Sequence, residues 1–328
     1  MSVPRYAYLG PAGTFTEAAL RQVAGADEAQ YVPQVDVVSA IEAVRSGEAD
    51  FAVVAIESTV EGGVTATLDA LAVGVPLVLL REVLVPVDFT LAAAPGVTLA
   101  DVRRLSAHPH AWVQCRHWLD AHLPGVVHVP ATSNTAPAAL IAQRLALGAS
   151  GGDPGDSTAA RELGFDAALV PPAAVGPYGL AVLAEHVADN PSLVTRFVVV
   201  GHPGDVPPPT GADKTTLDVH LPSNDAGALL TMLEQFAVRG VNLSRIESRP
   251  VGDSLGRYSF SLDAEGHIAE ERMGEAVMGL HRVCPHVRFL GSYPRADDVR
   301  AVVHVGTSDE DFRDARSWLD QLRDGRAH

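Results

Sequence analysis

The most informative apolar run extends from Leu193 to Val200 and is interrupted by Thr195 and Arg196. Its length and its β-branched residues predict a strand. A buried arginine keeps its proton, so an anion from the protein or from a ligand must meet it there. Two interpretations follow: Arg196 faces a small anionic ligand, or it leaves an edge strand and pairs with a surface carboxylate. Taken alone, the pattern favours the second.

The first two hundred residues alternate short apolar runs with helical patterns, which is typical of α/β folds. The run at 51–56 is wholly apolar, as expected for a parallel strand covered on both faces. Capping boxes at 14–17 and 39–42 predict helix starts. The predicted strands are 6–9, 51–56, 77–80, 83–87, 88–93, 126–129, 167–170 and 193–200, and the predicted helices are 14–23, 39–47, 64–71, 108–123, 132–148 and 158–163.

Three hydroxyl-rich segments follow these strands or open these helices. A glycine turn at 10–13 precedes Thr14 and Thr16, the segment 57–63 follows the buried strand, and 132–135 opens a later helix. Helix starts and the carboxyl ends of strands in open α/β sheets are common places for an anionic ligand. Each segment alone is also explained by helix capping or turn geometry. Their repetition indicates a small-ligand site.

The pattern changes beyond Gly201. Residues 201–213 contain four prolines and three glycines and predict an interdomain linker. The elements predicted after it are 215–221, 225–240, 244–249, 257–262, 267–281 and 287–290. Their order, βαββαβ, is that of a ferredoxin-like unit. The remaining segment has a strand-like start at 301–304 and a charged helix, and no place is predicted for it.

Composition narrows the class of protein. The 328 residues are 47% hydrophobic, and this length predicts two or three domains. Twenty-four Lys and Arg against forty Asp and Glu give a net charge of −16, which argues against nucleic acid or an anionic membrane as a partner. The chain starts without a signal-like segment, and no apolar run reaches about eighteen residues, so a cytoplasmic location is predicted.

The cysteines and histidines do not predict redox or metal chemistry. Cys115 and Cys284 lie far apart in the sequence and are interpreted as buried apolar residues. Four histidines gather around the helix predicted at 108–123, but helical spacing does not put three of them on one face, so they are interpreted as solvated. They are His108, His110, His117 and His122.

Four segments, in this order and spacing, resemble the prephenate dehydratases that carry a C-terminal ACT regulatory domain. The resemblance runs from about residue 5 to about residue 294. Each segment is short, but the four together are highly specific. They are Gly10-Pro11-Ala12-Gly13-Thr14-Phe15-Thr16; Ile56-Glu57 with Glu61-Gly62 and Thr67-Leu68-Asp69; Thr195-Arg196-Phe197; and Glu247-Ser248-Arg249-Pro250.

This resemblance implies an α/β catalytic domain at 1–200, made of two lobes similar to periplasmic solute-binding proteins. One lobe would comprise about 1–76 and 180–200, and the other about 77–179. A linker at 201–213 would lead to a ferredoxin-like ACT domain at 214–294. Residues 295–328 would be a C-terminal extension.

The reaction implied by the resemblance is that of a carbon–oxygen lyase in L-phenylalanine biosynthesis. Prephenate would lose CO2 and its C4 hydroxyl together and become phenylpyruvate, and no cofactor and no metal are implied. Because prephenate is poised to aromatise, orientation and hydrogen-bond donation should suffice. Thr195 would donate to the leaving hydroxyl, Phe197 would wall the ring, and Arg196 would either bind a carboxylate or pair with Glu57. The implied substrate-binding residues are Thr14, Phe15, Glu57, Ser58, Thr59, Gly62, Gly63, Gln114, Asn134 and Thr135.

Several positions depart from the family pattern. Ser58 and Thr59 stand where Asn and Ser are usual, and Asn134 stands where Ser is usual. Ala107 and Leu193 replace a Ser and an Asn and provide no hydrogen-bonding side chain. Because the segment 195–197 is intact, these departures concern substrate binding more than the reaction.

A regulatory site is implied for the second domain. The family binds amino acids where two ACT units meet, which implies inhibition by L-phenylalanine and a homodimer or homotetramer. The glycine of this motif would let the backbone approach a ligand, and the leucines would offer apolar surface to a ring. The alternative is that Gly227 only eases the passage into the helix capped by Asp225 and that Arg249 is a surface charge. The implied residues are Asn224, Gly227, Ala228, Leu229, Leu230, Asn242, Glu247, Ser248, Arg249 and Pro250.

Two other functions fit the same residues. An arogenate dehydratase acts on a substrate with an amino group in place of the keto oxygen. A non-catalytic sensor of aromatic metabolites would use the two-lobed fold without needing the Thr195 hydroxyl. Turnover of prephenate and arogenate separates these possibilities.

Overall fold

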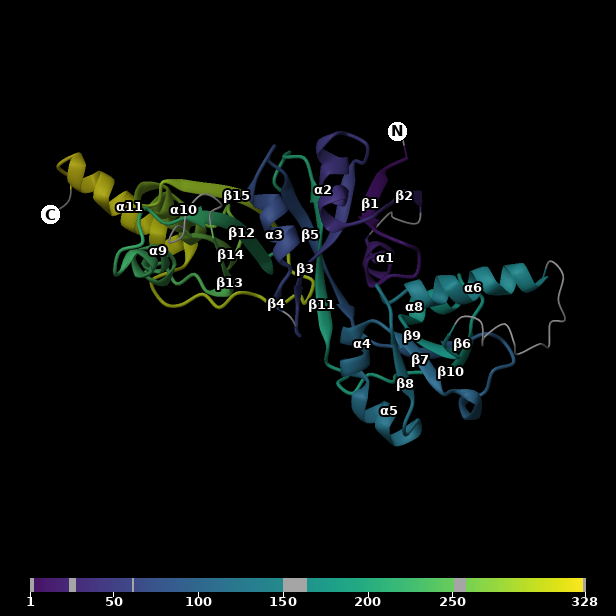
Figure 1. Cartoon of the computed structure of the whole chain (residues 1–328). Coiled ribbons are helices and arrows are strands. Elements are labelled where there is room, and N and C mark those ends of the chain that lie inside the picture. Colours follow the sequence, from purple (N-terminus) through teal and green to yellow (C-terminus); the bar gives the residue numbers. More distant parts are fainter. Residues whose placement is uncertain (1–2, 24–27, 61, 150–163, 251–257, 327–328) are drawn as a thin grey trace. The chain divides into compact units, whose positions relative to one another are not determined.

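The computed structural model describes residues 3–23, 28–60, 62–149, 164–250 and 258–326. The chain forms two compact units. The first unit comprises Met1–Ala43, Ala52–Val64 and Val83–Phe197, and the second comprises Val44–Phe51, Thr65–Glu82 and Val198–His328. Three sheets organise the chain, and Figure 1 labels their strands.

The first sheet carries the strand that contains Arg196. Its strands, in pairing order, are β2 (Gln30–Gln34), β1 (Arg5–Leu9), β3 (Phe51–Ser58), β11 (Val194–Gly201) and β5 (Val78–Pro86), with β4 (Gly62–Gly63) paired to β3. β11 lies between β3 and β5, so the interpretation of Arg196 as a residue on an edge strand is wrong. Its helices are α1 (Phe15–Leu20), α2 (Val37–Arg45) and α3 (Thr65–Ala72).

The second sheet is built around buried apolar strands of four residues. Its strands, in pairing order, are β10 (Ala181–Ala184), β6 (Thr90–Ala93), β9 (Ala167–Val170), β7 (Arg104–Ala107) and β8 (Val127–Pro130). β7 runs parallel to both β8 and β9, and β6 runs antiparallel to β9. Its helices are α4 (Pro109–Gln114), α5 (Arg116–His122), α6 (Ala136–Ala149) and α8 (Pro172–Val175), with a short 3-10 helix at Leu99–Asp101.

Two strands of this sheet were not predicted. β7, Arg104-Leu105-Ser106-Ala107, contains no β-branched or aromatic residue, and β10 falls in a stretch for which no strand is predicted. Leu105 is fully buried, and β7 pairs with strands on both sides. Neighbouring strands therefore decide this conformation, because local residue propensity for strands is weak and depends on context.

Several helices begin or end at other residues than predicted. The helix predicted at 108–123 is broken at Cys115, whose backbone has φ −113° and ψ 11°. The capping box at 39–42 is wrong, because α2 starts at Val37 and the Asp36 carboxylate accepts the Ser39 N–H at 2.7 Å. α1 ends at Leu20, three residues before the predicted end. The helix predicted at 158–163 lies outside the described residues.

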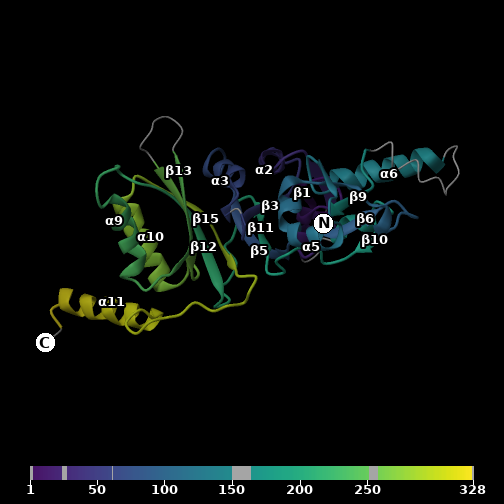
Figure 2. The same cartoon turned by 60° about the horizontal axis from the view of Figure 1, so that its bottom comes forward.

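The third sheet belongs to the second unit. Its strands, in pairing order, are β13 (Leu243–Pro250), β14 (Tyr258–Glu265), β12 (Asp213–His220) and β15 (His286–Pro294), all antiparallel. Figure 2 shows α9 (Ala228–Ala237) and α10 (Glu271–Val283) together on one side of this sheet. Leu217, Phe236 and Leu280 meet in the core between helices and sheet. The element order is the predicted βαββαβ.

The segment after β15 forms a helix, α11 (Asp309–Arg323), and residues 301–304 are not the predicted strand. Arg316 of α11 pairs with Glu271 and Glu275 of α10. Within the part of the chain that the structure describes, no helix is long and apolar enough to cross a membrane.

Candidate active site and regulatory site

The carboxyl end of β3 meets the start of β11. Arg196 is 5% exposed, and its Nη1 lies 3.4 Å from Glu57 Oε2. The Glu57 carboxylate therefore pairs with the buried guanidinium. Of the two interpretations of Arg196, this agrees with the one in which a protein carboxylate is its partner. The Glu57 side chain is 37% exposed, so the pair lies between the core and the surface.

Thr59 fixes the position of the Thr195 strand. Its N–H donates to the Val194 carbonyl, and its Oγ1 accepts the Val194 N–H, both at 3.0 Å. The neighbouring Ser58 Oγ accepts the Val60 N–H at 3.3 Å. These bonds hold the half-buried Thr195 beside the end of β3. Thr59 was predicted as a substrate ligand, and in this structure its hydroxyl oxygen also orients the backbone.

Gly62 and Gly63 bring a second backbone close to this point. They form β4, antiparallel to β3, with Glu57 opposite Gly63 and Ser58 opposite Gly62. Gly62 has φ +74°, which favours glycine. Phe197 follows Arg196 in β11 and is 2% exposed.

The start of α1 is held by its own side chains. Thr14 Oγ1 accepts the Glu17 N–H at 3.2 Å and donates to the Leu9 carbonyl at 3.1 Å. The Gly13 N–H donates to Glu17 Oε2. A Cβ on Gly13 would lie 2.7 Å from Ala174 Cα, and its φ of +81° also requires glycine. Phe15 packs edge-on against Phe89 at 5.6 Å between ring centroids.

Three predicted substrate residues carry buried polar atoms without a hydrogen-bond partner. The atoms are Gln114 Oε1, Asn134 Oδ1 and Thr135 Oγ1, and Thr135 is fully buried. Leaving such an atom unsatisfied costs about 1–3 kcal/mol, so native proteins rarely keep one without a ligand, water or functional role. Asn134 and Thr135 follow the carboxyl end of β8, and Gln114 ends α4, the helix that follows the parallel strand β7.

Asp189, which the sequence did not single out, links α4 and α5 to the segment before β11. The Asp189 carboxylate accepts the N–H groups of His117 and Trp118 at the start of α5, and its own N–H donates to the Gln114 carbonyl. The segment before β11 is thereby tied to the end of α4. A turn sequence, 189–192, was the only local signal of this role.

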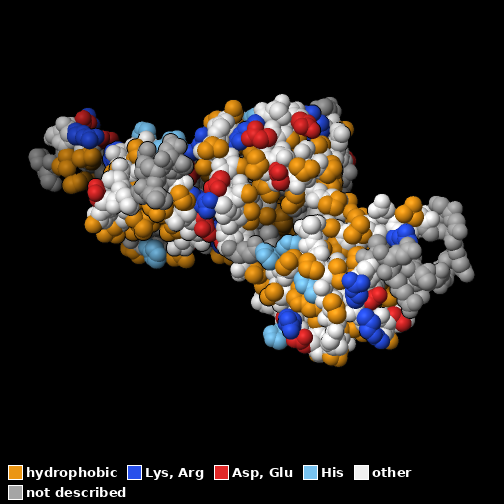
Figure 3. Space-filling model, viewed as in Figure 1, with side chains coloured by type: hydrophobic (Ala, Val, Ile, Leu, Met, Phe, Trp, Pro, Cys, Tyr) orange, Lys and Arg blue, Asp and Glu red, His pale blue; other side chains and the backbone are white. Residues whose placement is uncertain are grey.

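The histidines around α4 and α5 have packing or capping contacts. Figure 3 shows histidine side chains gathered over α4. His108 caps this helix, because its Nδ1 accepts the His110 N–H. The His122 ring stacks on Trp118 at 4.3 Å between centroids. His117 is largely exposed and lies 3.2 Å from Asp189.

The predicted regulatory segment lies at the start of α9. Gly227 is the N-cap with φ +92°, and α9 begins at Ala228. The prediction that Asp225 caps this helix is wrong, because Gly227 is the N-cap; the Asp225 backbone carbonyl accepts the Ala228 N–H. Leu229 and Leu230 are 40% and 59% exposed and present apolar surface. Asn224 and Ser248 are exposed, and the Asn242 carbonyl accepts the Glu265 N–H.

Arg249 joins two of the four segments that carry the resemblance. Its Nε and Nη2 donate to the two oxygens of Asp69 on α3, at 2.9 and 2.8 Å. Its side chain is 27% exposed, so Arg249 is a partly buried charge paired with Asp69 at the surface. These hydrogen bonds to Asp69 raise the pKa of the Arg249 guanidinium.

Comparisons with known proteins identify the family of the chain. The sequence pattern of the family described as Prephenate dehydratase matches residues 6–205. The prephenate dehydratase of Mycolicibacterium vanbaalenii is 44% identical over 337 residues, covering 99% of this chain and 100% of that protein. The crystal structure of prephenate dehydratase from Arthrobacter aurescens in complex with L-Phe has a TM-score of 0.87 and 51% identity, covering 98% of this chain and 99% of that chain.

A third protein of similar structure is described with another activity. The structure of GqqA, described as a novel type of quorum quenching acylase, has a TM-score of 0.73 and 28% identity, covering 88% of this chain and 97% of that chain. The two dehydratases are much closer in sequence and match almost the whole chain. The chain belongs to the prephenate dehydratase family.

Proposed function

We propose that the chain converts prephenate to phenylpyruvate in the synthesis of L-phenylalanine. One observation carries this assignment: Gln114, Asn134 and Thr135, all implied substrate residues, have buried polar atoms without a protein partner. On a substrate with two carboxylates, a keto group and a hydroxyl, the Thr135 hydroxyl finds oxygens to which it can donate, and the C4 hydroxyl can donate to one of the two amide oxygens. Family membership and the Thr195–Arg196 strand support the same reaction.

The chemistry asks for positioning rather than a strong nucleophile. One substrate carboxylate leaves as CO2, the C4 hydroxyl leaves with the bonding electrons, and the ring becomes aromatic. Thr195 donates to the departing hydroxyl, where donation strengthens as negative charge develops. The proton needed to form water comes from a donor at this position or from solvent.

The Arg196–Glu57 pair supports this mechanism through its charge. A strongly cationic binding site would stabilise the departing substrate carboxylate and oppose its loss as CO2. Because Glu57 lies 3.4 Å from Arg196, it offsets the guanidinium charge at the end of β3. A pocket with little net charge and several neutral donors suits a carboxylate that has to become neutral.

The test is direct detection of product. Purified protein and prephenate should give phenylpyruvate, measured by its ultraviolet absorbance in base. Preferential turnover of arogenate would assign the chain to arogenate dehydratase instead. Binding of prephenate without turnover would favour the non-catalytic sensor, and either result would overturn the proposal.

The Thr135 hydroxyl offers a test of substrate binding. Thr135→Val keeps the shape of the side chain and removes a buried oxygen without a protein partner. We expect KM to rise about tenfold, the loss of one hydrogen bond to a charged group, while thermal stability is unchanged or higher. Steady-state kinetics and thermal melting measure the two effects.

Thr90→Val is the matched control, because Thr90 is also a buried threonine of the first unit and has no implied ligand role. It should leave KM close to the wild-type value. An unchanged KM in Thr135→Val would remove Thr135 from the substrate site.

For the second part of the chain we propose a ferredoxin-like ACT domain at 214–294, after a two-lobed catalytic domain at 1–200 and a linker at 201–213. The antiparallel order β13-β14-β12-β15, with α9 and α10 on one face, supports the ferredoxin-like assignment. The extension, 295–328, contributes α11. We also propose a cytoplasmic location.

Inhibition by L-phenylalanine belongs to the same proposal. It is supported by the exposed leucines beside Gly227 and by the A. aurescens enzyme, whose crystal structure is a complex with L-Phe. The ligand would lie where two copies of the chain meet, so we propose a homodimer or homotetramer. Inhibition then follows if phenylalanine favours one arrangement of the subunits.

Gly227→Ala tests the regulatory site. The left-handed φ of +92° disfavours alanine, and the change should weaken phenylalanine inhibition about tenfold while kcat without effector stays near wild type. Gly306→Ala is the matched control, because Gly306 has φ +82° and, like Gly227, no atom within 4 Å of an added Cβ. Inhibition curves measure both. Full inhibition of Gly227→Ala would contradict the assignment.

A further inference from the structure

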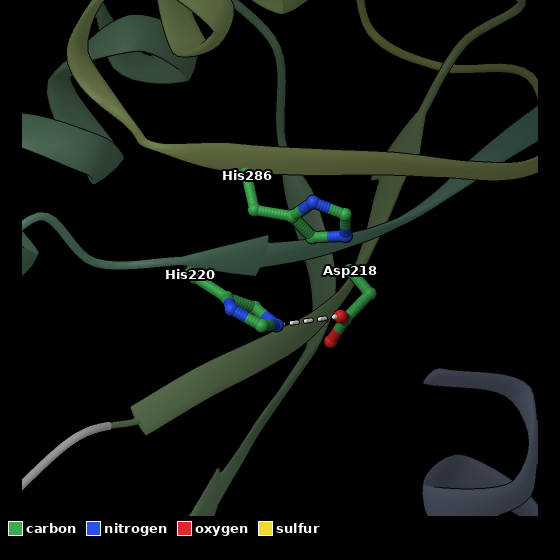
Figure 4. Close-up of side chains that lie close together, drawn as sticks. All are labelled: Asp218, His220 and His286. Carbon is green, nitrogen blue, oxygen red and sulfur yellow. Dashed lines mark ion pairs between the residues drawn. The ribbon is translucent and has the colours of Figure 1, made fainter. Parts of the chain in front are cut away.

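A polar cluster lies on the face of the third sheet that is not covered by α9 and α10. Leu217 and Val219 of β12 pack into the helix-covered core. Because side chains alternate along a strand, Asp218 and His220 point to the other face. His220 pairs in register with His286 of β15, which brings a second histidine to the same place. Figure 4 shows the three side chains converging.

The geometry of the cluster is close to that of a metal site. Asp218, His220 and His286 each offer one ligand atom, and these atoms all lie within 4.8 Å of one another. His220 Nε2 is 3.4 Å from Asp218 Oδ2, which matches the separation of about 3.3 Å between two ligands of a tetrahedral zinc ion. The widest pair needs to close by roughly 1.5 Å at most, which side-chain rotation of an exposed histidine can provide.

Asp218 gives an independent reason to expect a cation. The residue is 2% exposed, and its Oδ2 is buried without a hydrogen-bond partner. The Ser259 side chain hydrogen-bonds the carboxylate, which would orient a metal ligand.

The nearest arginine does not donate a hydrogen bond to Asp218 Oδ2. Arg288 lies opposite Asp218 in the register of β12 and β15. Its guanidinium donates to the carbonyls of Leu71, Val73 and Gly74, at 3.0 to 3.4 Å. It contributes positive potential near Asp218, and it leaves the Oδ2 atom without a hydrogen-bond donor.

We propose that Asp218, His220 and His286 bind a divalent transition-metal ion of the zinc class between β12 and β15. Two imidazoles and one carboxylate are a donor set typical of Zn²⁺, with solvent completing four ligands. Exposed His286 gives the ion a path from solvent. The ion joins the end of β12 to the start of β15.

The experiment uses the untagged full-length protein after treatment with EDTA. Titration with ZnCl2 by calorimetry should show one site per chain with micromolar or tighter affinity. Co²⁺ as a probe should give the strong visible absorption of a four-coordinate ion. His286→Gln, at an exposed position, should weaken binding at least tenfold without affecting the fold, and Asp218→Asn and His220→Gln should do the same.

His281→Gln is the matched control, because His281 is an exposed histidine on α10, outside the cluster. It should keep wild-type affinity. Three outcomes would overturn the proposal: no binding at protein concentrations of tens of micromolar, unchanged affinity in His286→Gln, or equal weakening in His281→Gln, which would show only non-specific binding to surface histidines. Circular dichroism of each variant confirms that the fold is retained.

Discussion

Replacement of Thr195 by alanine is expected to lower kcat by at least two decades, about 3 kcal/mol of transition-state stabilisation, with little change in KM. The half-buried Thr195 precedes the buried Arg196, and the bonds between Thr59 and Val194 fix its strand against the end of β3. A donor held in this way stabilises the departing hydroxyl more in the transition state than in the bound substrate.

Thr195→Ser and Thr195→Val are the controls. Serine keeps the hydroxyl and should retain at least a tenth of kcat, whereas valine keeps the shape and should be as slow as alanine. Thermal melting should be similar for all three, because the change lies at a half-buried position. If valine retained near-normal kcat, another group would be the donor.

The largest effect on stability is expected for Lys214→Met. Lys214 Nζ lies 3.2 and 3.0 Å from the two oxygens of Glu82, whose side chain is 1% exposed. Methionine would remove the Lys214 ammonium from the buried Glu82 carboxylate, and the free energy of unfolding should fall by about 3–5 kcal/mol. Chemical denaturation followed by fluorescence measures the loss.

Glu82→Gln combined with Lys214→Met should recover most of that stability, because no unpaired charge then remains buried. The exposed pair of Arg323 and Asp320 gives the comparison, and Arg323→Met should change stability by less than about 1 kcal/mol. A loss for Lys214→Met no larger than for Arg323→Met would show that the buried pair does not hold this unit together.

The Lys214–Glu82 ion pair affects the stability of any fragment made to separate catalysis from regulation. Residues 65–82 pack in one compact unit with 198–328, although the resemblance assigns them to the catalytic domain. A chain cut after Gly201 keeps Glu82 and Asp69 but loses Lys214 and Arg249. We therefore expect such a fragment to be less stable than the whole protein, and point variants such as Gly227→Ala test regulation more cleanly.

The sequence was sufficient for elements whose local pattern matches their burial. β3 and β9 contain continuous apolar runs, and the apolar run of β11 is interrupted only by Thr195 and Arg196; each forms a strand within two residues of the predicted bounds. Thr14 caps α1 as the capping box predicts. The order of elements from β12 to β15 also followed from the sequence, because periodicity along the chain records which face of each element is buried.

Tertiary structure decided whatever depends on partners distant in sequence. β7 is a strand because β8 and β9 flank it, and β11 is internal, so Arg196 meets Glu57 instead of surface solvent. Arg249 finds Asp69, 180 residues away, and the Asp218 cluster forms only when β12 and β15 pair in one register. Sequence patterns carry the period of each element, but the register and packing that bring charges together are properties of the folded chain.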